Sequence, residues 1–193
     1  MTMLRYNEGK ALMSLVPTSF FEAIFNTAYE VGAKPPTRLI RQVGEVLTFG
    51  AKKYAAHNWR KGGSWASVLN SGLRHLLAMM EGEEVDPESG LPHSGHLGCN
   101  IAFLLEFTHA NVGDDDRFKI LLELDLEADA DECLVPVLNS LLRFRDGGSV
   151  DDLREAAWEL ARYVETERFA GFEPESGSGT SSIPTLPFQL SMH

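Results

Sequence analysis

The sequence contains little cysteine and little positive charge. Its two cysteines, Cys99 and Cys133, have no metal-binding or redox spacing, so we interpret them as reduced, small apolar residues. The formal net charge is −11, because 17 Lys and Arg residues stand against 28 Asp and Glu residues. Binding to a nucleic-acid backbone requires clustered cations, so this composition argues against stable nucleic-acid binding. A phosphate ligand would need a local basic patch or a metal ion.

Several familiar signals are also missing. No apolar run approaches the length of a membrane span, and residues 1–10 lack the apolar core of a signal peptide. The sequence has no Gly-rich phosphate loop ending in Lys-Ser/Thr, no Gly-x-Ser-x-Gly elbow and no His-Asp dipeptide. These absences argue against P-loop enzymes, α/β-hydrolases and HD-type phosphohydrolases. They favour a protein of the cytoplasm, of a cell or of an infected cell.

Helical periodicity, in contrast, is abundant. With 193 residues of which 44% are hydrophobic, the chain can form one core or one core with a small appendage. Apolar residues spaced by three and four predict a mainly α fold, with helices at about 18–31, 38–54, 65–82, 92–110, 131–145 and 150–168. Thr37, Ser64 or Ser67, and Ser149 with Asp152 are the expected N-terminal caps.

Residues beyond 112 differ from the rest. Residues 113–116 are expected to form a solvated linker, and residues 173–193, rich in Ser, Gly and Pro, a mobile tail. In residues 118–128, apolar and polar side chains alternate, which predicts a strand, although the abundance of Leu and Glu also allows a helix. A strand without a partner in this chain would pair most simply with its copy in another subunit.

A cationic segment at residues 49–63 interrupts this acidic chain. It combines aromatic side chains, among them Tyr54 and Trp59, and glycines with cationic residues, among them Lys53, Arg60 and Lys61. The pattern fits an anionic ligand whose phosphates meet Lys and Arg while a flat base stacks on Tyr54 or Trp59. A solvated charged loop anchored by a Trp is the alternative.

The richest stretch is residues 71–107, which we interpret as two antiparallel helices joined by an ionisable loop. Antiparallel packing brings the carboxylates of the first helix end and the loop beside two histidines of the second helix. The predicted metal ligands are Glu81, Asp86, His93 and His96. Carboxylates suit Mg²⁺, and histidines shift the preference toward Mn²⁺. Alternatively, the histidines bind phosphate or act as general acid or base.

Further candidates complete this site. His75 is the predicted base, and Glu83 is a second catalytic candidate. Asn100 is a polar residue on an otherwise apolar helix, so its side chain is expected to have a polar partner. The predicted substrate-binding residues supply cationic, aromatic or amide groups: Lys10, Lys53, Tyr54, Asn58, Trp59, Arg60, Lys61, Arg74 and Asn100.

Three segments resemble the phage dATP/dGTP diphosphohydrolase N-terminal family. They are RYNEGK (5–10), FGAKKY with NWRKG (49–62), and LRHLLAMMEGEEVDPESGLPHSGHLGCNIAFLLE (73–106). The resemblance implies a MazG-like all-α pyrophosphohydrolase from phages that replace adenine by 2-aminoadenine. It implies hydrolysis of dGTP and dATP to the monophosphate and diphosphate with Mg²⁺ or a similar ion, in the cytoplasm of the infected host cell. One motif departs from MazG-like enzymes: their second metal motif, Glu-x-x-Asp, is replaced here by His93-Ser-Gly-His96.

The sequence therefore predicts a MazG-like helical bundle at 1–112, a small helical, possibly one-stranded, oligomerisation segment at 113–172 and a tail at 173–193. The expected assembly is a homo-oligomer, a dimer or tetramer. Two other functions stay open: a non-catalytic nucleotide-binding or assembly protein, and an enzyme that removes phosphates stepwise.

Overall fold

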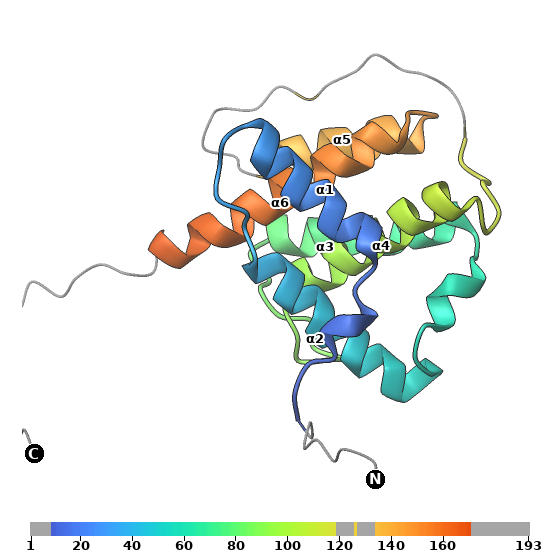
Figure 1. Cartoon of the computed structure of the whole chain (residues 1–193), viewed down its shortest axis with the longest axis horizontal. Helices are drawn as coiled ribbons and strands as arrows, with labels where there is room; N and C mark the ends of the chain where they lie inside the picture. The colour runs from blue at the N-terminus through green and yellow to red at the C-terminus, as the bar shows by residue number, and fades with distance from the viewer. Residues whose placement is uncertain (1–8, 119–125, 127–133, 171–193) are drawn as a thin grey trace, which may run out of the picture.

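The computed structural model describes residues 9–118, 126 and 134–170, and it is a bundle of helices (Figure 1). Within these residues there are six α-helices and no strand, which confirms the mainly α fold. The α-helices are α1 (Thr18–Glu30), α2 (Arg38–Tyr54), α3 (Trp65–Met80), α4 (His93–Ala110), α5 (Val135–Arg145) and α6 (Val150–Ala170). Two short 3-10 helices are η1 (Met13–Leu15) and η2 (Asn58–Lys61). Most of the segment expected to be a strand, 118–128, lies outside the described residues, as does the expected tail at 173–193.

Helix α4 is the centre of the bundle. It contacts α1, α2, α3 and α6, and buried residues occur on every side of it rather than on one stripe. Small residues let its neighbours approach closely: a Cβ atom added at Gly98 would lie 2.6 Å from Cγ2 of Val43 on α2. The packing of α2 on α4 therefore depends on the absence of a side chain at this position.

Replacing Gly98 with Ala is expected to destabilise the protein by about 1–3 kcal/mol, because the added methyl group overpacks the α2–α4 contact. Gly50, on α2, is the matched control, since a Cβ atom there meets nothing within 4 Å. Gly50→Ala should stabilise by roughly 0.5–1 kcal/mol, because Ala is the better helix former. Urea unfolding of the two variants measures both effects. Equal stabilisation by both substitutions would contradict the close approach.

The cap of α2 differs from the prediction. Thr37 precedes the helix but makes no side-chain cap hydrogen bond. Instead the backbone N–H of Arg38 donates to Oε1 of Glu165 on α6, at 2.7 Å, and the guanidinium of Arg38 donates to the carbonyl of Val164, at 3.0 Å. A distant carboxylate thus satisfies the helix end, which spacing within the sequence could not reveal. The other two expected caps are confirmed: Ser64 accepts from the N–H of Ser67, and Asp152 accepts from the N–H of Ser149.

Residues 113–116 are mostly exposed, as expected of a solvated linker, but they also hydrogen-bond to the start of α3. The N–H of Trp65 donates to the carbonyl of Asp114, at 3.0 Å, and Asp116 accepts from the N–H of Ala66, at 2.8 Å, and from the hydroxyl of Ser64, at 2.7 Å. These hydrogen bonds lower the pKa of Asp116. The segment therefore serves as a tertiary cap on the start of α3.

Helices α5 and α6 share the hydrophobic core of the first four helices. Phe144 of α5 is fully buried and stacks on Trp65 of α3, with 6.2 Å between ring centroids. The guanidinium of Arg117 lies over the Phe144 ring at 3.9 Å and donates to the carbonyl of Phe144 at 2.6 Å. Leu153, Leu160 and Val164 of α6 belong to the same core cluster. The division of the chain at residue 112 stays a prediction, and these contacts cross it.

Candidate active site

A pocket of about 410 Å³ lies where the cationic segment meets the helical hairpin. Its walls come from the end of α2, from η2, from α3 and α4, and from the loop between α3 and α4. It brings together eight of the residues predicted from the sequence: Lys53, Tyr54, Asn58, Trp59, His75, Asp86, His96 and Asn100. The two informative stretches of the sequence therefore form one site.

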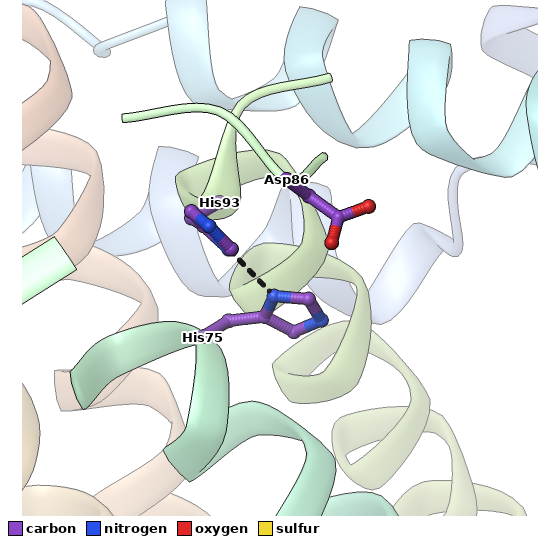
Figure 2. Close-up of side chains that lie close together, drawn as sticks. All are labelled: His75, Asp86 and His93. Carbon is purple, nitrogen blue, oxygen red and sulfur yellow. Dashed lines mark hydrogen bonds between the residues drawn. The ribbon is translucent and has the colours of Figure 1, made fainter. Parts of the chain in front are cut away.

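Three imidazoles meet at one end of this pocket. His75 comes from α3, while His93 and His96 come from the first turn of α4. The Nδ1 atoms of His75 and His93 are 2.8 Å apart, a hydrogen-bond distance that Figure 2 draws as a dashed line. The rings of His75 and His96 are stacked, with centroids 4.7 Å apart and an angle of 17° between planes. The i,i+3 spacing on α4 thus places His93 at the Nδ1 edge of the His75 ring and His96 against the face of that ring.

Asp86 supplies the carboxylate of this cluster and points toward His75 (Figure 2). Its Oδ2 atom accepts from the N–H of Ser89, at 2.9 Å, and lies 3.6 Å from Nε2 of His96. The hydroxyl of Ser89 is in turn 2.7 Å from the same nitrogen of His96. Burial acts to raise the pKa of Asp86, but the Ser89 hydrogen bonds and the neighbouring imidazoles outweigh it and lower the pKa. Asp86 is therefore charged at neutral pH.

For the imidazoles of His75 and His96, burial lowers the pKa. Desolvation, followed by the charges of His96 and His93, lowers the pKa of His75 to about 4. Desolvation also lowers the pKa of His96, although the charges of Asp86 and Glu88 oppose it. Both rings are therefore neutral at neutral pH, the form in which imidazole binds metal ions.

This donor set can hold a cation. One ligand atom from each of His75, Asp86 and His93 lies within 4.8 Å of the other two. A carboxylate with neutral imidazoles suits Mn²⁺ and related transition metals better than Mg²⁺, which prefers oxygen ligands alone.

The other end of the pocket is cationic and aromatic. Nζ of Lys53 forms an ion pair with Oε1 of Glu88, at 2.8 Å, and this hydrogen bond raises the pKa of Lys53. The indole of Trp59 stacks on Phe103, with centroids 5.3 Å apart, and the guanidinium of Arg60 lies 5.2 Å from the Trp59 ring centre. Tyr54 is 59% exposed, so its ring is accessible to a ligand.

Several predicted residues lie outside the pocket lining. Arg60, Lys61 and Arg74 are exposed, and Lys10 lines a neighbouring hollow that shares Phe49 and Ser89 with the pocket. Glu81 is exposed at the C-terminal cap of α3 and is not part of the cluster of possible metal ligands found among the described residues. Glu83 lines a different pocket, and its Oε2 atom lies 3.6 Å from Nε2 of His93. The functional roles of these residues stay predictions.

Asn100 has a partner other than the one expected. Its amide nitrogen donates to the carbonyl of His96, one turn earlier in the same helix, at 2.8 Å. No ligand or opposing helix is needed to explain its burial, although Asn100 also lines the pocket.

Sequence reasoning missed two residues that shape the site. Ser89 joins Asp86 to His96, and Phe103 is the stacking partner of Trp59. The spacing of Asp86 and Ser89 is a local signal for Ser89, because Asp side chains commonly accept from backbone N–H groups a few residues on. Spacing places Phe103 on the same helical stripe as His96 and Asn100, but its contact with Trp59 depends on how η2 packs on α4.

Comparisons with known proteins show the family of this chain. A family model described as dATP/dGTP diphosphohydrolase, N-terminal, matches residues 2–117. The chain belongs to this family. The match contains α1–α4 and every residue of the pocket lining, whereas α5 and α6 lie beyond it.

A curated relative from Salmonella phage PMBT28, named dATP/dGTP diphosphohydrolase, is 27% identical over 117 residues. That alignment covers 61% of this chain and 33% of the relative, so the chain spans about a third of the length of the relative that it matches. No solved structure matches the chain. Within the part of the chain that the structure describes, no helix is both long and apolar enough to cross a membrane.

Proposed function

We propose that this chain hydrolyses purine deoxynucleoside triphosphates, dGTP and dATP, to the monophosphate and diphosphate with a divalent cation. One observation carries the proposal: a single pocket joins a carboxylate–imidazole cluster to a lysine and accessible aromatic rings. A triphosphate needs cationic partners along its oxygens, and a purine needs a flat apolar surface. Membership of the family and the name of the phage relative support the choice of substrate.

We propose Asp86, His75 and His93, whose ligand atoms lie within 4.8 Å of one another, as the residues that hold the cation, with His96 beside Asp86; the imidazoles favour Mn²⁺ over Mg²⁺. When bound, such an ion neutralises phosphate oxygens and favours formation of the attacking hydroxide. The pKa of about 4 makes His75 a weak base, so a ligand role suits it better than the base role expected from the sequence. Ser89 holds Asp86 and His96 in place through its two hydrogen bonds.

The remaining residues bind and orient the nucleotide. Lys53 exchanges Glu88 for the phosphate oxygens, since both partners offer anionic oxygen and the existing ion pair is exposed to water. Trp59 is fixed on Phe103 and forms a rigid wall, while the accessible ring of Tyr54 stacks on the purine. Asn58 supplies an amide that can hydrogen-bond to the base edge.

The proposed role in the cell follows from these products. Hydrolysis of dATP would keep adenine out of phage DNA, and dGMP would feed synthesis of the 2-aminoadenine nucleotide in the cytoplasm of the infected host. The phage origin of the relative supports this setting.

Incubation of the full chain with dGTP and Mn²⁺ tests the proposal. We expect dGMP and diphosphate in equal amounts, separated by anion-exchange chromatography, and the same pattern with dATP. The pyrimidine nucleotide dCTP is the matched control and should react more slowly. Orthophosphate with dGDP would indicate stepwise removal instead, and binding of dGTP without products would indicate a non-catalytic nucleotide-binding protein.

A further inference from the structure

A second hollow, of about 580 Å³, adjoins the candidate active site. It is lined by residues 9–12, by one face of α2 and by the loop between α3 and α4. Phe49 and Ser89 belong to the lining of both cavities. Ser89 also hydrogen-bonds to Asp86 and to His96. The hollow therefore begins directly beside the carboxylate–imidazole cluster.

Two lysines give this hollow a positive charge. Lys10 and Lys52 line it, and Glu45 is the only carboxylate among the described residues of the lining. Lys53, on the pocket side, forms an ion pair with Glu88, whereas neither lysine of the hollow forms a salt bridge within the described part of the chain. The chain as a whole has a net charge of −11, so two unpaired cations in one hollow reverse the average sign. An anionic ligand is the partner that matches them.

The backbone holds the two lysines on neighbouring segments. Lys10 follows Gly9, whose φ of 76° forms a turn that only glycine adopts readily. Two residues later, the N–H of Leu12 donates to Oγ1 of Thr48 on α2, at 2.7 Å, and η1 packs against the same helix (Figure 1). Lys52 comes one helical turn after Thr48. A hydrogen bond therefore fastens the segment of Lys10 to the helix of Lys52.

The proposed reaction needs positive charge beyond the α-phosphate. Water adds to the α-phosphorus, the bond from this phosphorus to the oxygen that leads to the β-phosphorus breaks, and diphosphate leaves with the bonding electron pair while a proton passes to solvent. Cations fixed near the leaving oxygens stabilise the charge that develops there. Lys53 is the only lysine or arginine among the described residues of the pocket lining, and one ammonium group cannot balance a triphosphate.

We propose that the hollow of Lys10 and Lys52 binds the β- and γ-phosphates of the substrate and, after the reaction, the diphosphate product. The polyphosphate passes from the cation cluster between Phe49 and Ser89, which border both cavities. Lys52 thereby becomes a substrate-binding residue, and the carboxylate of Glu45 weakens the hold on the product. The nucleoside monophosphate ends at its α-phosphate and does not reach the hollow. The inference rests on the proposed function for the identity of the substrate.

Product inhibition of dGTP hydrolysis, at constant free Mn²⁺, tests the hollow separately from the pocket. Lys52→Met keeps an unbranched side chain but removes the charge. It should weaken inhibition by diphosphate, and lower kcat/KM for dGTP, by about tenfold each, while inhibition by dGMP stays unchanged. Lys34→Met is the matched control, because it removes an exposed lysine that lines a different hollow, and it should change none of the three values. Both lysines are exposed, so neither substitution should disturb the fold.

Glu45→Gln should have the opposite effect, because it removes the negative charge that faces the same ligand. We expect inhibition by diphosphate to strengthen by roughly twofold to fivefold. Diphosphate inhibition that Lys52→Met leaves unchanged, or an equal weakening of inhibition by dGMP, would overturn the inference.

Equilibrium dialysis with radiolabelled diphosphate and Mn²⁺ repeats the comparison without turnover. The unsubstituted chain and Lys34→Met should bind diphosphate equally, and Lys52→Met about tenfold more weakly. Equal binding by all three would reject the diphosphate site. Binding that depends on Lys52 in a chain that does not hydrolyse dGTP would instead reject the proposed function and support the anion site.

Discussion

Asp86→Asn is expected to reduce kcat/KM for dGTP hydrolysis by on the order of a hundredfold or more, or about 3 kcal/mol of transition-state stabilisation. The substitution keeps the size of the side chain and an oxygen that can accept from the N–H of Ser89. It removes the negative charge beside His75 and His96, which is the charge that we propose holds the cation. Initial rates across dGTP and Mn²⁺ concentrations measure the effect, and thermal unfolding verifies that the fold is kept.

Glu81→Gln is the control for this experiment. Glu81 was also expected from the sequence to bind the metal, but the structure places it exposed at the end of α3 and outside the pocket lining. Its substitution should change kcat/KM by less than about threefold, as for surface positions without a specific partner. A loss at Glu81 equal to that at Asp86 would move the proposed metal site to the end of α3.

Phe144→Ala is expected to lower the free energy of unfolding by about 3–5 kcal/mol, the usual result of removing a buried aromatic ring. The change removes a ring that contacts both Trp65 of α3 and the guanidinium of Arg117. In a chain of this size the transition temperature should fall by roughly 10 °C. Because the ring joins α5 to α3, the whole helical bundle should unfold in one transition at the lower temperature.

Phe118→Ala is the matched control, since Phe118 is 73% exposed and its loss should change stability by no more than about 0.5 kcal/mol. Differential scanning calorimetry distinguishes the outcomes. Two transitions, with only one of them shifted by Phe144→Ala, would show that the segments on either side of residue 112 unfold independently.

Local sequence features were sufficient to predict the helices of this fold. The apolar period of α2 predicted its bounds, and Ser64 and Ser149 marked helix starts because their caps lie within three residues. The cap that Glu165 provides for α2 was missed, because its carboxylate comes from α6. The sequence predicts a solvated linker at residues 113–116, because Asp residues usually face water, but it does not reveal that Asp116 also accepts from the backbone N–H of Ala66 in α3.

The sequence indicated many of the residues that line the candidate pocket, but not how their side chains contact one another. Spacing placed His93 and His96 on one stripe of a helix, so both became candidate ligands. Packing separates them: His93 is buried between His75 and Glu83, while His96 lines the pocket beside Asp86. Such a distinction depends on how α3 crosses α4, which no local pattern encodes.

The stack formed by Trp65, Phe144 and Arg117 has a practical consequence. The family match ends at residue 117, so a chain ended there would keep Trp65 and the Arg117 guanidinium but lose the phenyl ring that contacts both. It would also leave the faces of α1 and α4 that α6 covers open to water. Exposed hydrophobic surfaces of this kind promote aggregation, so the truncated protein should precipitate under conditions in which the full chain stays in solution.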